Sequence, residues 1–168
     1  MEQTFLFSKT IEFERGIFVT AYADRQGLRR ISVGLEKKPA SRAGRIPPEI
    51  KRALDSALSD VSACLKGSGL NPPLRGAVLP EASRFRLRVW RETAKIPHGQ
   101  TRTYSEIAET AGGVKYRRAV AGALAANIFP ILIPCHRVVG AKGAGGYSGG
   151  GGAEMKKTLL EVESGARN

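Results

Sequence analysis

Apolar and polar positions alternate in three short segments within residues 1–35. Residues 4–9, 16–22 and 28–35 are rich in β-branched and aromatic side chains, as half-buried strands are. Residues 24–27 (DRQG) separate the second and third segments and are typical of a hairpin turn. The pattern therefore predicts an N-terminal β-sheet.

After Pro48 the spacing of apolar residues changes. They recur every three to four residues, as in a helix, and no longer every second residue. Apolar residues recur at helical spacing from Ile50 to Leu65, and a proline is well tolerated in the first turn of a helix. Gly67 predicts the end of this helix. Cys64 lies beside the apolar stripe, where we expect a packed small hydrophobe and not a reactive thiol.

Residues 67–76 (GSGLNPPLRG) interrupt these patterns and predict a linker between two domains. We place the domains at residues 1–72 and 73–168. The second domain opens with another helical pattern, which contains Trp90 and ends at residues 97–100 (PHGQ).

Two short helices are predicted next, over residues 104–111 and 116–126, with a pair of glycines between them. Thr103 and Glu106 have the spacing of a capping box at the start of the first helix. The second helix opens with an arginine pair, so the arrangement is that of a helix-turn-helix. Many helical hairpins bind nothing, and the pattern alone does not establish DNA binding.

The second helix of this pair carries few bulky side chains. Its small residues are Ala119, Ala121, Gly122, Ala123, Ala125 and Ala126. Close packing of helices favours such a composition. A slender helix would also fit the minor groove of B-DNA, which is only about 6 Å wide, and an arginine at its start would reach among the bases.

Composition narrows the class of protein. The chain has 168 residues, 42% hydrophobic and 25% charged, which is typical of globular proteins. No apolar run is long enough to span a bilayer. Two cysteines and two histidines form neither a disulfide scaffold nor a four-ligand zinc site. The net charge of +12 indicates either simple solubility or an anionic partner, with nucleic acid first.

The positive charge is unevenly distributed. Residues 73–168 carry +8 of the +12, and no acidic residue occurs between Glu109 and Glu154. A surface that faces phosphates needs such a stretch, because each carboxylate would repel the nucleic-acid backbone. Chance clustering remains the alternative.

The reactive candidates lie in residues 130–139 (PILIPCHRVV). A short buried strand at residues 131–133 is predicted to deliver Cys135, with His136 adjacent. A thiol is a nucleophile only as thiolate, and an imidazole can remove its proton. A buried structural cysteine beside a surface histidine would give the same dipeptide. These two residues alone therefore do not distinguish a catalytic cysteine from a structural one.

The wider motif is more specific. PCHRV, preceded by PILI and followed by GYSGG, resembles the signature of the O6-alkylguanine-DNA alkyltransferases, or methylated-DNA–protein-cysteine methyltransferases. Upstream, VW, IPHGQTRTYSEIA and RAVAGALAANIF are similar to the same family. The resemblance covers residues 85–163. It implies an α/β two-domain fold: a ribonuclease H-like N-terminal domain of sheet and helix, and a mainly helical, winged-helix-like C-terminal domain with a helix-turn-helix.

The resemblance implies a suicidal repair reaction. Cys135 would take the alkyl group from O6 of guanine irreversibly, and each molecule would act once. His136 would deprotonate Cys135 through a water, and Glu163 would orient His136. Tyr104 would donate a hydrogen bond to the departing base, and Asn127 would brace the turn before the active-site strand.

The resemblance also implies how duplex DNA would be held. Arg118 would fill the space left by the flipped nucleotide. The remaining DNA-binding residues implied are Arg117, Ala119, Ala121, Gly122 and Thr103, and the base pocket is Pro130, Val138, Tyr147 and Ser148.

Two features depart from the family pattern. Gly151 and Gly152 lengthen the loop before the last helix, so the alignment of Glu163 crosses an insertion and Glu161 competes for its role. The zinc-binding cysteines of the animal enzymes have no counterparts, so we expect no metal and no cofactor. We expect a cytoplasmic monomer that associates with the nucleoid, or with the nucleus in a eukaryote, and that needs no protein partner or membrane.

Three other functions would each explain part of the sequence. An alkyltransferase-like damage sensor would have another residue, usually tryptophan, in place of Cys135. A helix-turn-helix regulator would explain the charge but not PCHRV. A Cys-His hydrolase would need an oxyanion motif that the sequence does not show.

Overall fold

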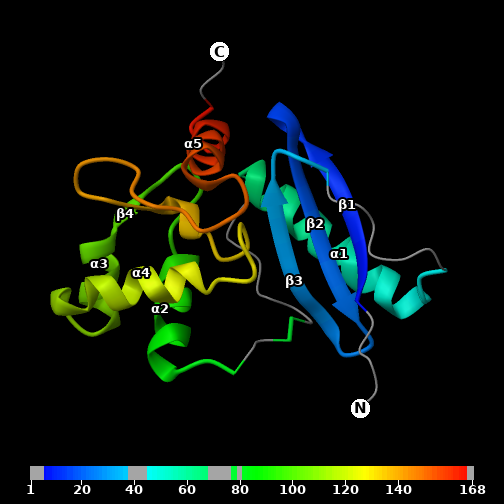
Figure 1. The fold of residues 1–168 in the computed structure, drawn as a ribbon, viewed down its shortest axis with the longest axis horizontal. Helices are drawn as coiled ribbons and strands as arrows, with labels where there is room; N and C mark the ends of the chain where they lie inside the picture. Colours follow the sequence, from blue (N-terminus) through cyan, green and yellow to red (C-terminus); the bar gives the residue numbers. More distant parts are fainter. Residues whose placement is uncertain (1–5, 38–44, 68–76, 79–80, 166–168) are drawn as a thin grey trace.

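The computed structural model describes residues 6–37, 45–67, 77–78 and 81–165. A β-sheet and one long helix form one side of the molecule, and a group of shorter helices forms the other (Figure 1). The α/β architecture in two parts is the one predicted from the sequence.

The three predicted N-terminal strands are confirmed. β1 (Phe7–Phe13), β2 (Ile17–Asp24) and β3 (Gly27–Gly34) form an antiparallel sheet in that order. In the predicted hairpin between β2 and β3, the Asp24 side chain accepts a hydrogen bond from the Gln26 amide at 2.8 Å. Because the strand order is β1-β2-β3, β3 lies at one edge of the sheet, and this edge faces the rest of the molecule (Figure 1).

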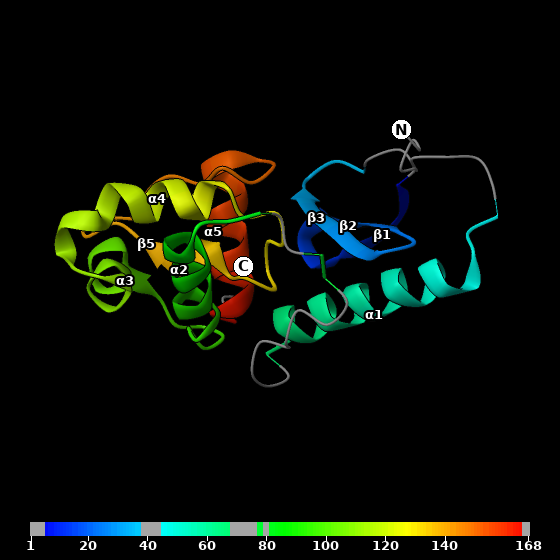
Figure 2. The same ribbon diagram turned by 90° about the horizontal axis from the view of Figure 1, so that it is seen from below.

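α1 (Pro48–Leu65) lies along one face of the sheet (Figure 2). The apolar stripe that predicted this helix is its buried face, which includes Leu54 and Val61. Cys64 is buried in the same core, and burial raises the pKa of its thiol to about 11. At neutral pH this thiol is protonated and unreactive, as expected from the sequence.

Three helices form the other side: α2 (Arg84–Ala94), α3 (Tyr104–Ala111) and α4 (Arg117–Ala125). The predicted capping box at the start of α3 is present, with Thr103 as the N-cap. The Trp90 indole donates a hydrogen bond to the carbonyl of Ala123 at 2.8 Å and so joins α2 to α4. α3 and α4 are the predicted helix-turn-helix pair.

Residues 131–133 are buried, as predicted, but they form a tight turn and not a strand. Ile131 adopts a left-handed backbone with φ of 74°, and the Ile133 amide donates to the carbonyl of Phe129 at 2.9 Å. The prolines on either side of this segment lack amide donors, so a ladder cannot extend in either direction. Apolar character alone therefore suggested the wrong local structure.

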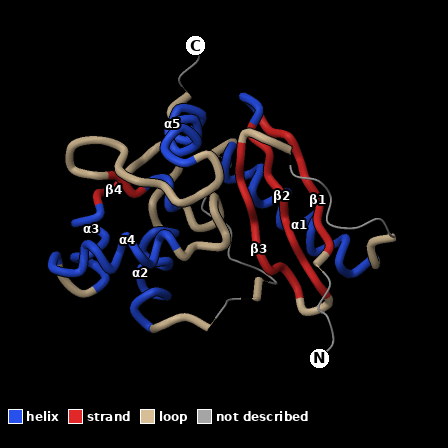
Figure 3. Tube along the Cα trace, viewed as in Figure 1, coloured by secondary structure: helices blue, strands red, loops and turns tan. Residues whose placement is uncertain are grey.

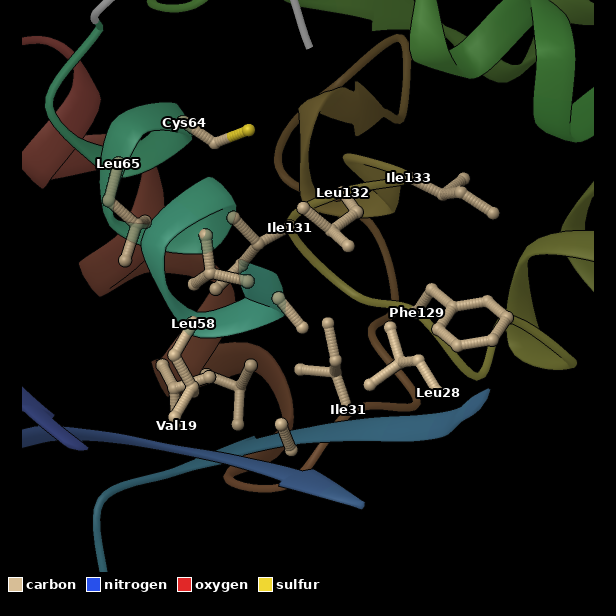
Figure 4. Packing of buried hydrophobic residues seen from close by; sticks show 14 of the residues in the cluster. Val19, Leu28, Ile31, Leu58, Cys64, Leu65, Phe129, Ile131, Leu132 and Ile133 are labelled. Atoms are coloured by element: carbon tan, nitrogen blue, oxygen red, sulfur yellow. The ribbon is translucent and has the colours of Figure 1, made fainter. Parts of the chain in front are cut away.

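The turn at residues 129–133 enters the space between α1 and β3 (Figure 4). The Ile31 amide of β3 also donates to the carbonyl of Ile128 at 2.8 Å. Leu159, from the C-terminal helix α5 (Gly152–Glu163), is part of the same core. The sheet side and the helical side therefore share one hydrophobic core.

A short parallel ladder connects distant parts of the helical side. It pairs β4 (Arg102–Thr103, labelled in Figure 3) with β5 (Val138–Val139, labelled in Figure 2), so it joins the start of α3 to the segment after Cys135. Apart from Gly67, the predicted linker and the domain boundary after residue 72 lie outside the described residues. Within the described ranges, no helix combines the length and apolarity needed to cross a membrane.

The shared core predicts that α5 supports both sides. Leu159 is fully buried, so we expect Leu159→Ala to lower the free energy of unfolding by about 2–5 kcal/mol. Leu35→Ala is the matched control, because Leu35 is 38% exposed. Chemical denaturation monitored by tryptophan fluorescence measures both variants, and equal losses would contradict the shared core.

Candidate active site

Cys135 begins a single 3-10 turn, Cys135–Arg137, directly after the buried turn. Its side chain is almost buried, with 8% exposure. Burial raises the pKa of this thiol, and a hydrogen bond from Asn127 Nδ2 to Sγ at 3.3 Å acts in the opposite direction. The thiol therefore needs a base if it is to react at neutral pH.

His136, Arg137 and Glu163 form a buried charged cluster behind the cysteine. His136 Nε2 lies 2.8 Å from Glu163 Oε1. Arg137 donates to both carboxylate oxygens, with Nε to Oε2 and Nη2 to Oε1 both at 2.8 Å. Arg137 Nη1 also donates to the carbonyl of Ile96 at 2.6 Å. The cluster joins the PCHRV motif to the last turn of α5.

The electrostatics of the cluster select one form of His136. Burial alone would raise the pKa of Glu163, but hydrogen bonds from His136 and Arg137, together with the positive charge of Arg137, lower it to about 2. Burial lowers the pKa of His136, so the ring is neutral near pH 7. An ionised Glu163 accepts a hydrogen bond from a protonated Nε2, which leaves Nδ1 as the basic nitrogen. Nδ1 is buried without a hydrogen-bond partner among the described atoms, so it is free to accept a proton.

Glu161, the competing carboxylate from the sequence, lies elsewhere. It pairs with Arg15 at 2.8 Å and with Lys157 at 3.7 Å, and it is one-third exposed. The contact with His136 comes from Glu163 in spite of the glycines inserted before α5.

The Asn127 side chain forms hydrogen bonds to the turn that precedes Cys135 and to the cysteine itself. Its amide nitrogen donates to the carbonyl of Ile133 at 2.9 Å as well as to Cys135 Sγ. Its carbonyl oxygen accepts a hydrogen bond from the Phe129 amide at 2.9 Å. One side chain thus closes the turn and contacts the thiol.

A cavity of about 480 Å³ opens at Cys135. Tyr104 and Leu124 line two of its sides, and Tyr147 and Ser148 contribute from the glycine-rich loop. The Tyr104 hydroxyl donates to the carbonyl of Gly146 at 3.2 Å. The cavity brings the nucleophile and two tyrosines together, although they are far apart in the sequence.

The other predicted pocket residues lie less directly on this cavity. Pro130 is buried and lines a second cavity beside the first. Val138 is fully buried and lies outside the lining of both. Its carbonyl accepts a hydrogen bond from Lys156 Nζ at 2.7 Å.

Lys156 is a functional candidate that the sequence reasoning missed. It is fully buried, and its ammonium group donates to the carbonyls of Val138 and Gly146. It also lies 5.7 Å from the centre of the Tyr104 ring. Burial lowers its pKa, and its charge lowers the pKa of Cys135. Lys156 lies two helical turns before Glu163, on the same face of α5. This spacing was the only signal in the sequence, and it is weak because charged side chains on a helix usually point into solvent.

The predicted DNA-binding residues of α4 lie on one exposed surface, adjacent to the cavity. They are Arg117, Arg118, Ala119, Ala121 and Gly122. Thr103 and both arginines line a shallow hollow beside the active-site cavity, and Ala121 borders both. The Thr103 hydroxyl is already used in the capping box.

Comparisons with known proteins agree with this geometry. Residues 84–165 match the family described as "6-O-methylguanine DNA methyltransferase, DNA binding domain". The chain is 42% identical over 120 residues to a methylated-DNA–protein-cysteine methyltransferase of Mycolicibacterium paratuberculosis, covering 68% of each chain. The chain belongs to the O6-methylguanine-DNA methyltransferase family.

Other family members extend the likeness. The structure of Mycobacterium tuberculosis OGT in complex with DNA matches with a TM-score of 0.71 and 31% identity, covering 94% of this chain and 93% of that one. A methyltransferase of Methanothermobacter thermautotrophicus is 42% identical over 118 residues. This chain spans 62% of the length of that relative and 52% of a mimivirus relative.

The second residue missed in this methyltransferase-family chain is Arg137. Arg137 belongs to the PCHRV motif, so the motif already marked it as a candidate. Its partner, Glu163, lies far away in the sequence and could not be identified from the residues around Arg137. Among the described residues, no group of three or more His, Cys, Asp or Glu side chains could hold a metal ion.

The buried cluster predicts a large stability effect of Glu163. Glu163→Gln removes the carboxylate that neutralises the buried Arg137, so we expect a loss of about 3–5 kcal/mol in the free energy of unfolding. Glu161→Gln, which removes a surface pair, should cost about 0–1 kcal/mol. Urea denaturation of both variants at pH 7 measures the difference.

The effect of Glu163 should also depend on pH. Its folded pKa of about 2 lies below the unfolded value of about 4.3. Its ionised form therefore stabilises the fold fully above the unfolded pKa, and this contribution is lost as the pH falls toward 2. The stability difference between wild type and Glu163→Gln should shrink over that interval, and a constant difference would contradict the assigned ionisation.

Proposed function

We propose that this protein repairs DNA by direct reversal, transferring an alkyl group from O6 of guanine in duplex DNA to Cys135. The observation that carries the proposal is the position of Cys135. The thiol borders a base-sized cavity, a His–Glu pair lies behind it, and an exposed helix of small residues lies beside it. The names of the relatives agree with this reaction.

The first step would be activation of the thiol. The neutral His136 has a free basic Nδ1, and a water molecule can carry the proton from Cys135 to it. Glu163 would stabilise the resulting imidazolium, because its Oε1 accepts a hydrogen bond from Nε2 at 2.8 Å. Lys156 and Asn127 would favour the thiolate through charge and a hydrogen bond, respectively.

The second step would be displacement at the alkyl carbon. The thiolate sulfur forms a bond to carbon, the bond from carbon to O6 breaks, and the electron pair passes to guanine. Tyr104 is placed to protonate or hydrogen-bond the departing base, since it lines the same cavity as Cys135. Burial raises the pKa of Tyr104, so its hydroxyl keeps its proton at neutral pH. The thioether product is stable, so each molecule would act once.

α4 would deliver the base to the cavity. Its small residues fit the narrow minor groove, and its arginines supply positive charge for the phosphates. The alkylated base would rotate out of the stack into the cavity, and Arg118 would fill its place. Tyr147 and Ser148 would contact the flipped guanine, because they line the cavity. Pro130, which lines the neighbouring cavity, and the buried Val138 would support the pocket without lining it. The DNA complex of the M. tuberculosis relative supports a nucleic-acid partner.

The fold proposed for the two parts follows the same resemblance. We assign residues 1–72 to a ribonuclease H-like domain and residues 73–168 to a winged-helix-like domain. The three-stranded sheet with α1 and the α3–α4 pair with the β4–β5 ladder support these assignments.

Intact-protein mass spectrometry tests the reaction directly. After incubation with excess duplex DNA containing O6-methylguanine, wild type should gain the mass of one CH2 unit per molecule and no more. Cys135→Ala should gain none while still binding the DNA, because the groove-facing residues remain. Cys64→Ala is the matched control and should still be methylated, because the Cys64 thiol is not at the cavity.

Two outcomes would overturn the proposal. Methylation of Cys135→Ala would show that another residue is the nucleophile. Release of free methyl product with many turnovers per molecule would indicate a hydrolase or another transferase.

Arg118→Ala tests base flipping. Flipping costs a few kcal/mol, so we expect transfer from duplex DNA to slow by about tenfold or more. Transfer from free O6-benzylguanine should change little, because the free base needs no extrusion. Arg91→Ala, on the exposed surface of α2, controls for the loss of one positive charge. Equal losses on duplex and free base would contradict the role of Arg118.

A further inference from the structure

A second cavity of about 460 Å³ meets the first one at the nucleophile. It lies between β3 and two segments of the helical side, residues 124–130 and 148–150. Cys135 and Ser148 line both cavities. A guanine bound in the first cavity would therefore present its O6 substituent at the junction of the two.

Two glycines let the loop that lines the second cavity approach β3 closely. A Cβ atom at Gly150 would clash with the carbonyl oxygen of Val33, and one at Gly149 would clash with the Tyr147 ring. Side chains at these positions would collide with β3 and with the pocket wall. Gly150 also lines the second cavity, so the absence of a side chain there sets the position of the loop wall.

The second cavity carries a positive charge that no acidic group offsets. Arg30 and Ser32 line it from β3, and none of its lining residues is acidic. The neighbouring Arg29 is paired with Asp24 at 2.6 Å. Arg30 is exposed and forms no ion pair with any described residue. Its guanidinium is therefore available to an anionic ligand.

We propose that the second cavity receives the distal end of the O6 substituent and that Arg30 favours substituents ending in a carboxylate, such as O6-carboxymethylguanine. The proposal rests on the proposed function and specifies its substrate class. The sulfur lies where the cavities join, so the reacting carbon would be at that junction and the remainder of the group beyond it.

The transfer step is the same for the larger group. The sulfur–carbon bond forms, the bond from carbon to O6 breaks, and guanine takes the electron pair and a proton. The carboxylate is not consumed. It remains attached through its CH2 to Cys135 as a thioether, next to Arg30, so the same interaction is present in substrate and product.

The test compares three duplexes that differ only at O6: carboxymethyl, its neutral isostere carbamoylmethyl, and methyl. Second-order transfer rates are measured for wild type, Arg30→Gln and Arg25→Gln. Arg25 lies on the exposed hairpin turn, outside the cavity, and controls for total charge. The ratio of carboxymethyl to carbamoylmethyl rates should fall about tenfold in Arg30→Gln, the effect expected from losing a charge-assisted hydrogen bond, and stay unchanged in Arg25→Gln.

A charge reversal gives an independent result. Arg30→Glu should lower the carboxymethyl rate further and raise the rate for an O6-(2-aminoethyl) duplex above that of wild type. This gain cannot arise from misfolding.

Three results would overturn the proposal. Equal losses on charged and neutral substituents in Arg30→Gln would show that Arg30 contacts the DNA backbone. An unchanged ratio would show that it contacts neither. If wild type transferred no group from any of the duplexes, both the proposed function and this inference would be wrong. If wild type transferred the methyl group but the ratio of carboxymethyl to carbamoylmethyl rates were unchanged in Arg30→Gln, only this inference would be wrong.

Discussion

The buried carboxylate of Glu163 is the interaction on which the site depends. Taking a carboxylate out of water is costly, and here the cost is offset by hydrogen bonds from His136 and Arg137 at 2.8 Å. The same contacts hold α5 against the segment that carries the nucleophile. One group therefore selects the tautomer of His136, neutralises Arg137 and fixes the end of the chain, so its loss would affect stability and thiol activation together.

The nucleophile is positioned by a turn that belongs to two layers of the molecule. Phe129, Ile131 and Ile133 are buried in the core shared with α1 and β3, while Asn127 binds both the turn and the sulfur. The N-terminal sheet thus supports the site without supplying a residue to the proposed reaction. β3 also forms one wall of the second cavity, through which we infer an influence on substrate choice.

Affinity and selectivity have separate physical origins in this arrangement. The stretch between Glu109 and Glu154 contains no acidic residue, and Arg117 and Arg118 line the hollow next to the cavity. These charges would attract DNA without reading a base sequence. The cavity, with its tyrosines and the junction at Cys135, would select the damaged base. Such a division suits a protein that inspects guanines anywhere in duplex DNA.

Local sequence determined much of the secondary structure, because hydrophobic period, capping residues and glycine stops act within a few residues. It determined the three strands, α1, the Thr103 capping box and the helix pair, and PCHRV identified the family. It failed at residues 131–133, where apolar character cannot distinguish a buried strand from a buried turn. The partner of Arg137, the buried Lys156 and the meeting of two cavities at Cys135 join residues far apart in the chain. Only tertiary packing decided these, because burial and its electrostatic consequences arise when α5, β3 and the PCHRV turn come together.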